Sequence, residues 1–233
     1  MKVFAVVPAR SGSKGFKNKN IARIGGLSLL ELAINVGLGC NEIDSVYVST
    51  DSKKYENIAK SFGAISLGLR PSILSNDRAK TIDVIIDLIN KIKKDYDYLV
   101  LLQPSSPVRE PKDIKKMFNI LLSENADAIV SVVQIDEPHP HKLKIVDGRG
   151  FIAPFLENTT SEIPRQELPS ALALNGAVYI VRVKKMLEQK TFLPKKTLPF
   201  LMKKNLNIDS EEDFEYLKYL VDNKKVKLFL KKN

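Results

Sequence analysis

The chain has 233 residues, of which 44% are hydrophobic and 27% are charged, and its formal net charge is +10 at pH 7. This length and hydrophobic content are typical of a soluble globular protein with one sizeable core, and they exclude a disordered chain. The longest apolar stretches are about five residues long, whereas a membrane-spanning helix needs roughly 20, so no association with a membrane is expected.

A lone cysteine, Cys40, excludes an intrachain disulfide, and the reducing cytoplasm is therefore the expected location. The N-terminus lacks the apolar stretch and the cleavage site of a secretory signal. Most of the basic excess lies in residues 182–233. Binding to nucleic acid is not expected, because the sequence has neither a basic stripe interleaved with aromatic residues nor a known recognition module.

Short apolar runs alternate with amphipathic segments through the first 133 residues. The apolar runs predict strands that are buried on both faces, and the amphipathic segments predict helices. The alternation predicts an α/β fold with a doubly wound, mostly parallel sheet. The expected strands are 3–7, 45–49, 64–69, 98–102 and 128–133, and the expected helices are 27–39, 53–62, 81–94 and 112–123.

The regular alternation stops at residues 134–174, which contain several prolines and a Gly-Arg-Gly turn. These features predict a small insertion with one or two hairpins inside a single domain that spans residues 1–233. An apolar strand at 177–181 and a closing helix at 211–222 follow. Residues 224–232 alternate apolar residues with lysines, which predicts an edge strand or a solvated tail.

A long polar stretch, residues 8–20, follows the first predicted strand. Ligands of open α/β sheets collect beyond the carboxyl ends of the strands, so this stretch is a candidate binding loop. Gly12 and Gly15 allow backbone N–H groups to approach an oxyanion closely. The composition predicts a polyphosphate cradle, with a solvated basic turn as the alternative. The cations of the loop are Arg10, Lys14, Lys17 and Lys19.

The loop sequence Ala9-Arg-Ser-Gly-Ser-Lys-Gly15, with Lys19 and Asn20, resembles the signature of bacterial acylneuraminate cytidylyltransferases, also called CMP-sialic acid synthetases. Similar motifs follow in the same order over nearly the whole chain. They lie at residues 49–51, 69–71, 101–109, 165–169, 175–180 and 208–213. The resemblance implies a Rossmann-like nucleotidyltransferase that transfers CMP from CTP to a nonulosonic sugar acid and releases pyrophosphate, with Mg²⁺ as cofactor.

The resemblance also assigns residues to the nucleotide. Arg10 and Lys19 would stabilise charge on the phosphates as catalytic residues. Asn20, Arg70 and Thr81 would contact the base, although a helix N-cap is the alternative for Thr81. The remaining nucleotide-binding positions are Ala9, Ser11, Gly12, Ser13, Lys14 and Gly15.

Other positions are assigned by resemblance to the sugar. Gln103 would contact the sugar, and Ser105 and Ser106 would line its pocket. Lys142 and Arg165 would meet the sugar carboxylate, for which a guanidinium is well suited. The insertion at 134–174, which carries Lys142 and Arg165, resembles the family's dimerisation element, so a homodimer is expected. The apolar walls would be Tyr179 and Phe192, with core packing as the alternative for both.

The metal would be held by hard oxygen ligands, which Mg²⁺ prefers. By resemblance these are Asp209, also a catalytic residue, and Asn207, which stands where the family has an aspartate. Asp51 is a further possible ligand, or a helix cap. His139 and His141 lie among prolines and are expected to be turn residues.

Two other functions remain open at this point. A cytidylyltransferase for the eight-carbon sugar acid Kdo shares the fold, but its first loop differs from residues 8–20. A nucleotide-binding or nucleic-acid-binding protein without catalysis is the alternative from another class, suggested by the net charge and by Asn207.

Overall fold

The computed structural model describes residues 1–12, 15–157, 159–203 and 206–230. Seven strands form its central sheet, and they are β1 (Val3–Pro8), β4 (Ser45–Ser49), β5 (Ile65–Ser66), β6 (Tyr98–Leu101), β7 (Ala128–Ile135), β10 (Ala171–Arg182) and β11 (Thr197–Leu201). Their order is β11-β7-β10-β6-β1-β4-β5. Neighbouring strands are parallel except where β10 pairs with β6 and β7. The mostly parallel sheet that the sequence predicts is confirmed.

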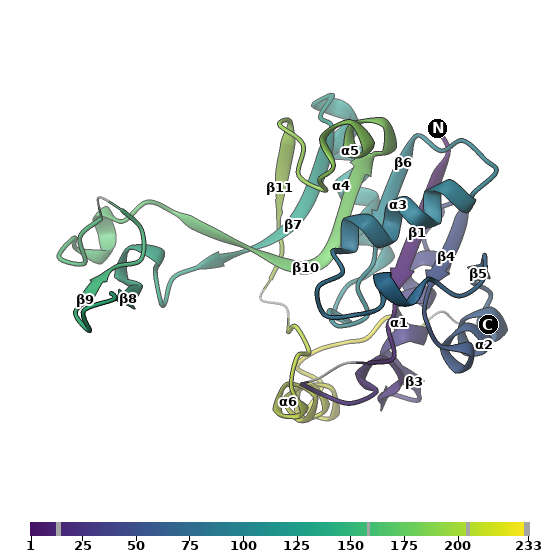
Figure 1. The fold of residues 1–233 in the computed structure, drawn as a ribbon, viewed down its shortest axis with the longest axis horizontal. Coiled ribbons are helices and arrows are strands. Elements are labelled where there is room, and N and C mark those ends of the chain that lie inside the picture. The colour runs from purple at the N-terminus through teal and green to yellow at the C-terminus, as the bar shows by residue number, and fades with distance from the viewer. Residues whose placement is uncertain (13–14, 158, 204–205, 231–233) are drawn as a thin grey trace.

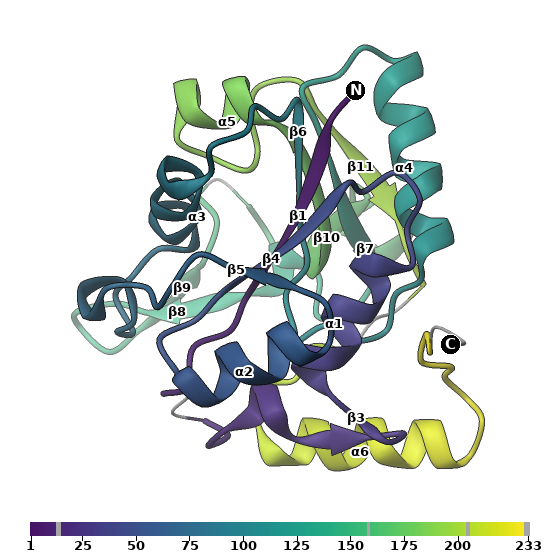
Figure 2. The ribbon, with the colours of Figure 1, turned by 90° about the vertical axis from the view of Figure 1, so that its right-hand side faces the viewer.

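Helices cover both faces of this sheet (Figure 2). The helices α1 (Leu29–Leu38), α2 (Lys53–Ser61) and α4 (Pro111–Ser123) pack in one apolar cluster, and α3 (Thr81–Lys91) and α5 (Val183–Gln189) pack in another. The central strand β1 supplies residues to both clusters, with Val3 and Ala5 on one face and Phe4 on the other. This burial on both faces explains why the strand is a continuous apolar run instead of an alternating one.

A third layer lies below the sheet, where α6 (Glu211–Asp222) packs near the small hairpin of β2 (Arg23–Ile24) and β3 (Leu27–Ser28) (Figure 1). Leu228 is buried in this layer, and Asn35 Nδ2 donates a hydrogen bond to Phe229 O at 3.0 Å. The prediction of an edge strand or a solvated tail is therefore wrong for these residues. Leu228 is buried in one apolar cluster with residues of α6, and this burial holds the end of the chain against the third layer.

Several predicted elements are shorter in the structure, and two of these differences have a clear local cause. The helix predicted from residue 27 begins at Leu29, because Ser28 and Glu31 form a reciprocal capping box. The strand predicted at 64–69 is only Ile65–Ser66. Turn residues explain the second difference, since Gly68 has a positive φ of 96° and the chain then leaves the sheet.

An arm projects from the sheet where β7 and β10 continue beyond it as a two-stranded ribbon (Figure 1). The arm carries a hairpin of β8 (Lys144–Val146) and β9 (Ile152–Pro154), and it corresponds to the predicted insertion. Among the helices of the described residues, none has the length and apolar character required to cross a bilayer.

Candidate functional site

A cavity of about 590 Å³ lies beyond the carboxyl ends of β1 and β6. The chain order reverses here, because β4 and β6 lie on opposite sides of β1. Such a switch point is where open α/β sheets bind ligands. The cavity brings together ten of the residues that the sequence assigns to the site, namely Arg10, Gly15, Lys19, Asn20, Arg70, Thr81, Gln103, Ser105, Asn207 and Asp209.

The glycine-containing loop approaches the opposite wall of this cavity at Gly15. A Cβ at Gly15 would lie 2.6 Å from the backbone oxygen of Asp209, so a side chain does not fit there. The start of the loop is held by Asp51, whose carboxylate accepts hydrogen bonds from Ser11 N at 2.8 Å and Ser11 Oγ at 3.0 Å. Ser52, not Asp51, is the N-cap of α2. Asp51 is therefore a support for the loop.

The other loop residues are placed differently. Ala9 is fully buried beneath the loop, and Gly12 follows Ser11 without lining the cavity. Ser13 and Lys14, both predicted to bind the nucleotide, lie outside the described residues.

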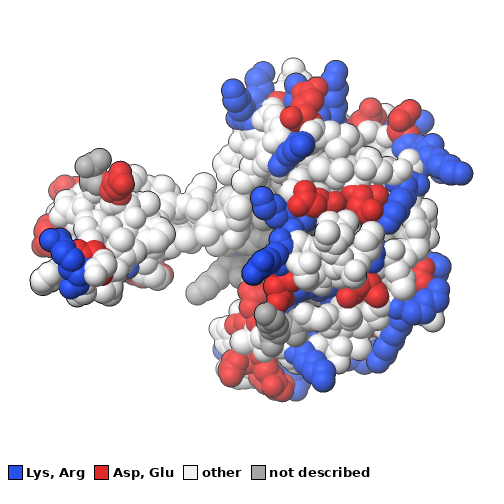
Figure 3. Space-filling view, viewed as in Figure 1, with Lys and Arg blue, Asp and Glu red and all other residues white. Residues whose placement is uncertain are grey.

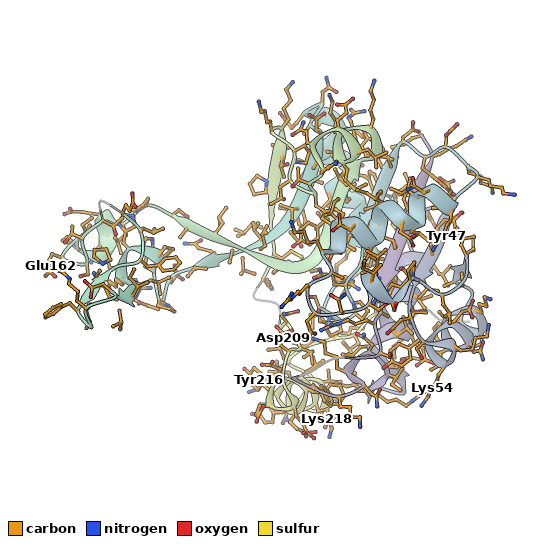
Figure 4. The ribbon with its side chains drawn as sticks, in the orientation of Figure 1. Tyr47, Lys54, Glu162, Asp209, Tyr216 and Lys218 are labelled. Carbon is orange, nitrogen blue, oxygen red and sulfur yellow. The ribbon has the colours of Figure 1, made fainter. Side chains whose placement is uncertain are left out.

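Two cations of the cavity are each paired with a carboxylate from a distant part of the chain. Arg10 Nη1 lies 2.6 Å from Asp77 Oδ1, and Lys19 Nζ lies 3.0 Å from Asp209 Oδ1. Lys19 Nζ also donates to Ile208 O at 2.8 Å. Asp209 lies between the sheet and α6 (Figure 4), immediately before the N-cap of α6, and its N–H donates to Asp213 of the capping box. The arrangement fixes the positions of both cations in the cavity wall, each beside a carboxylate.

The part of the cavity near α3 contains Asn20, Arg70 and Thr81. Burial lowers the pKa of Arg70, whose Nε donates to Ser75 Oγ at 3.2 Å. Asn20 Nδ2 donates to Arg10 O at 2.9 Å. Thr81 is the first residue of α3, and Lys80 occupies the N-cap position, so the N-cap interpretation of Thr81 is wrong.

A second cavity of about 340 Å³ adjoins the first, because Gln103 and Asn207 line both. Tyr179 lines the second cavity, and burial raises the pKa of its hydroxyl. Ser106 is buried behind the wall, where its Oγ donates to Asn175 O or Asn207 Oδ1.

Three predicted sugar-binding residues lie elsewhere. Phe192 packs against the Tyr179 ring in the core and lines neither cavity, so the core-packing alternative describes it. Lys142 and Arg165 are on the arm. Lys142 Nζ lies 3.5 Å from Glu137 Oε1, and Arg165 lines a separate cavity at the base of the arm. In this single chain the arm residues do not meet Gln103.

The two histidines occupy a turn of the arm, as the sequence predicts. His139 Nε2 lies 2.9 Å from Pro169 O, and His141 N donates to His139 Nδ1 at 3.3 Å. Within the described ranges, no group of three or more His, Cys, Asp or Glu side chains is arranged to hold a metal.

Asn207 and Asp209 are the predicted metal ligands, and they contact each other. Asn207 Nδ2 donates to Asp209 Oδ2 at 2.6 Å, while Asn207 Oδ1 accepts from Ser106. One carboxylate and one amide oxygen are few ligands for Mg²⁺. This donor set fits a cation that is held largely by phosphate oxygens and water.

Sequence reasoning missed three residues of the site, which are Asp77, Arg109 and Gly176. Arg109 is only 2% exposed, and its Nη1 donates to Gln103 O at 2.8 Å and to Ala177 O at 2.7 Å. Burial lowers the pKa of Arg109 to about 9. Its guanidinium therefore joins the two segments that line the second cavity. The available signal was that Arg109 is the last residue of the motif at 101–109.

A family model described as cytidylyltransferase matches residues 4–232. The chain belongs to the cytidylyltransferase family. The resemblance stated from the sequence motifs is thus confirmed.

Several curated relatives are similar over nearly the whole chain. An N-acylneuraminate cytidylyltransferase of Escherichia coli O18:K1:H7 is 34% identical over 219 residues, covering 92% of this chain and 51% of that protein. A CMP-N,N'-diacetyllegionaminic acid synthase of Legionella pneumophila is 32% identical over 229 residues, covering 95% of this chain and 97% of that protein. The chain spans 57% of the length of the N-acylneuraminate cytidylyltransferases of Streptococcus agalactiae, to which it is 30% identical.

A solved structure described as CMP:2-keto-3-deoxy-manno-octonic acid synthetase complexed with CTP has the same fold. Its TM-score is 0.72 at 18% identity, and the match covers 96% of this chain and 100% of that one. At this identity, the likeness establishes the nucleotidyltransferase fold alone.

Proposed function

We propose that this protein is a cytidylyltransferase that transfers CMP from CTP to the anomeric hydroxyl of a nonulosonic acid and releases pyrophosphate. The observation that carries the proposal is the pair of adjoining cavities, one cationic and one polar, which share Gln103 and Asn207. A triphosphate suits the cationic cavity, and a sugar acid suits its neighbour. The shared wall would bring the hydroxyl and the α-phosphorus together.

The residues of the first cavity would hold CTP along its length. Arg10 and Lys19 would bind the phosphates through charge-assisted hydrogen bonds, and Arg70, Asn20 and Thr81 would contact the base. Gly15 lies so close to the Asp209 backbone that only a glycine fits there, which would bring the loop N–H groups and Asp209 to the same phosphates.

In the reaction, the anomeric oxygen forms a bond to the α-phosphorus while the bond to the β-phosphate oxygen breaks. The hydroxyl proton would leave to a water held by the Asp209 carboxylate. Asp209 and Asn207 would hold Mg²⁺, which when bound neutralises charge on the departing pyrophosphate. Gln103 would orient the sugar, and the Arg109 guanidinium would hold the Gln103 backbone in place.

Pyrophosphate release from CTP is the direct test of this function. It should appear only when a sugar acid is added, and a panel of sialic, legionaminic, pseudaminic and Kdo sugars identifies the acceptor. No release with any member of this panel would contradict the proposal.

Replacing Arg10 should remove much of the charge stabilisation in the transition state. We expect Arg10→Ala to lower kcat by about 10²- to 10³-fold while the protein stays folded. Arg23→Ala is the matched control, because Arg23 is exposed and does not line the cavity. Near-normal turnover of Arg10→Ala would show that Arg10 does not contact the phosphates.

The arm supports a homodimer as part of the proposal. Uncharged residues dominate its visible face (Figure 3), and Val146, Phe151 and Ile152 are each at least 65% exposed. Apolar patches of this kind mark interaction sites, and a partner's arm would bring Lys142 and Arg165 to the sugar. Sedimentation should give a dimer that Ile152→Asp dissociates, and a monomeric wild type would refute this point. The buried thiol of Cys40 suits the reducing cytoplasm as the location.

A further inference from the structure

The Arg10–Asp77 ion pair places a carboxylate where the proposed function needs a phosphate. Both residues line the first cavity, and their closest atoms are 2.6 Å apart. Their side chains are 31% and 39% exposed, so the pair is accessible to a ligand. Arg10 belongs to the loop after β1, whereas Asp77 belongs to the segment between β5 and α3. The contact therefore joins two walls of the cavity.

The segment that carries Asp77 is braced by its own hydrogen bonds. Ser75 Oγ donates to Pro71 O at 3.0 Å, and Asn76 Nδ2 donates to Ile73 O at 2.9 Å. On the other side of Asp77, Arg78 N donates to Asn76 Oδ1 at 2.9 Å. These bonds hold the backbone at the cavity wall, so the carboxylate of Asp77 is presented to Arg10 by a formed turn.

We infer that Asp77 occupies the Arg10 guanidinium as an internal anion, and that it sets the affinity and the selectivity of the cavity for polyphosphates. The inference rests on the proposed function, in which Arg10 binds the phosphates of CTP. A ligand must displace Asp77 from Arg10. A polyphosphate has several charges to contact Arg10 and Lys19 together, whereas a single phosphate group has fewer. Asp77 thus lowers affinity for every anion and excludes the small ones.

The test compares wild type with Asp77→Asn by titration calorimetry in metal-free buffer, using CTP, pyrophosphate and inorganic phosphate as probes. Asparagine has nearly the same shape as aspartate, so the fold is retained. Asp87→Asn is the matched control, because Asp87 pairs with Lys91 on α3 at 2.7 Å and does not line the cavity.

We expect Asp77→Asn to bind CTP and pyrophosphate about 3- to 10-fold more tightly. The ligand no longer has to break an accessible ion pair, and it is no longer repelled by the Asp77 carboxylate. Inorganic phosphate should gain measurable affinity. The gain should shrink between about 50 and 300 mM salt, because the Debye length shortens, and it should be largely lost in an Arg10→Ala background. Asp87→Asn should bind as wild type.

The outcomes separate this inference from the proposed function. If wild type binds no CTP even after Mg²⁺ is added, the proposed function is overturned, while the pyrophosphate titration still decides the role of Asp77. If Asp77→Asn binds pyrophosphate no better than wild type, or if neither protein binds it, the inference about Asp77 is overturned. A gain of the same size in the Arg10→Ala background also overturns it.

Discussion

Gly176 offers a sharp test of how the second cavity is built. Its φ is +70°, and a Cβ there would lie 2.8 Å from Gln103 Oε1 and 2.9 Å from Ser106 Oγ. Gly176→Ala therefore has two separate effects. The left-handed backbone costs an alanine about 1 to 2 kcal/mol of stability. The new methyl group also displaces the side chain of Gln103 from the wall that both cavities share.

The second effect should dominate the kinetics. A displacement of several tenths of an ångström to 1 Å at a positioning residue costs up to about 10²-fold, or about 2.7 kcal/mol. We expect kcat/KM for the sugar acid to fall by about 30- to 100-fold. The Kd for CTP should stay near its wild-type value, because Gly176 does not line the first cavity and Gln103 is assigned to the sugar and not to CTP.

Gly26→Ala is the matched control. Gly26 also has a positive φ, +87°, but a Cβ there meets no atom within 4 Å. It should lose similar stability in urea denaturation and keep its activity. If Gly176→Ala retains wild-type kcat/KM while it is destabilised as much as Gly26→Ala, then Gln103 is not held by this close contact and our reasoning about the cavity is refuted.

Three further predictions concern stability. Burial raises the pKa of the Cys40 thiol from 9.0 to about 12, so the folded state keeps a proton that the unfolded chain loses. Relative to Cys40→Ala, wild type should lose about 1.4 kcal/mol of unfolding free energy per pH unit above pH 9, and parallel profiles in urea would contradict this. Hydrogen bonds from Lys53 and two other side chains lower the pKa of Glu56 from 4.5 to about 2. The stabilising contribution of Glu56 is present above pH 4.5 and is lost as the pH falls toward 2. The unfolding free energy of Glu56→Gln should therefore fall less than that of wild type between pH 4.5 and pH 2. Equal falls in the two proteins would show that these bonds do not form. Leu228 is 6% exposed and Leu230 is 49% exposed. Leu228→Ala should therefore cost about 2 to 3 kcal/mol and Leu230→Ala less than about 0.5 kcal/mol, whereas equal losses would mean that the tail is not packed.

Local pattern was sufficient to predict the class of fold. The strands of the first 133 residues are short apolar runs, and β1 is buried on both faces as such a run requires. The loop after β1 could be recognised as a cradle because its glycines and cations are neighbours in the sequence. The boundaries were less accurate, since Ser28 caps α1 and the turn at Gly68 shortens β5.

The sequence by itself determined the alternation of strands and helices and the chemistry of the first loop, because both depend on residues that are close along the chain. Only the tertiary structure decided which charges meet. Lys19 and Asp209 are 190 residues apart in the chain, and Asp77 reaches Arg10 from another crossover of the sheet. No local periodicity encodes such contacts, since they depend on how the strand ends gather at one edge of the sheet. The packing of Leu228 against α6 was likewise hidden by its lysine neighbours until the third layer of the fold was known.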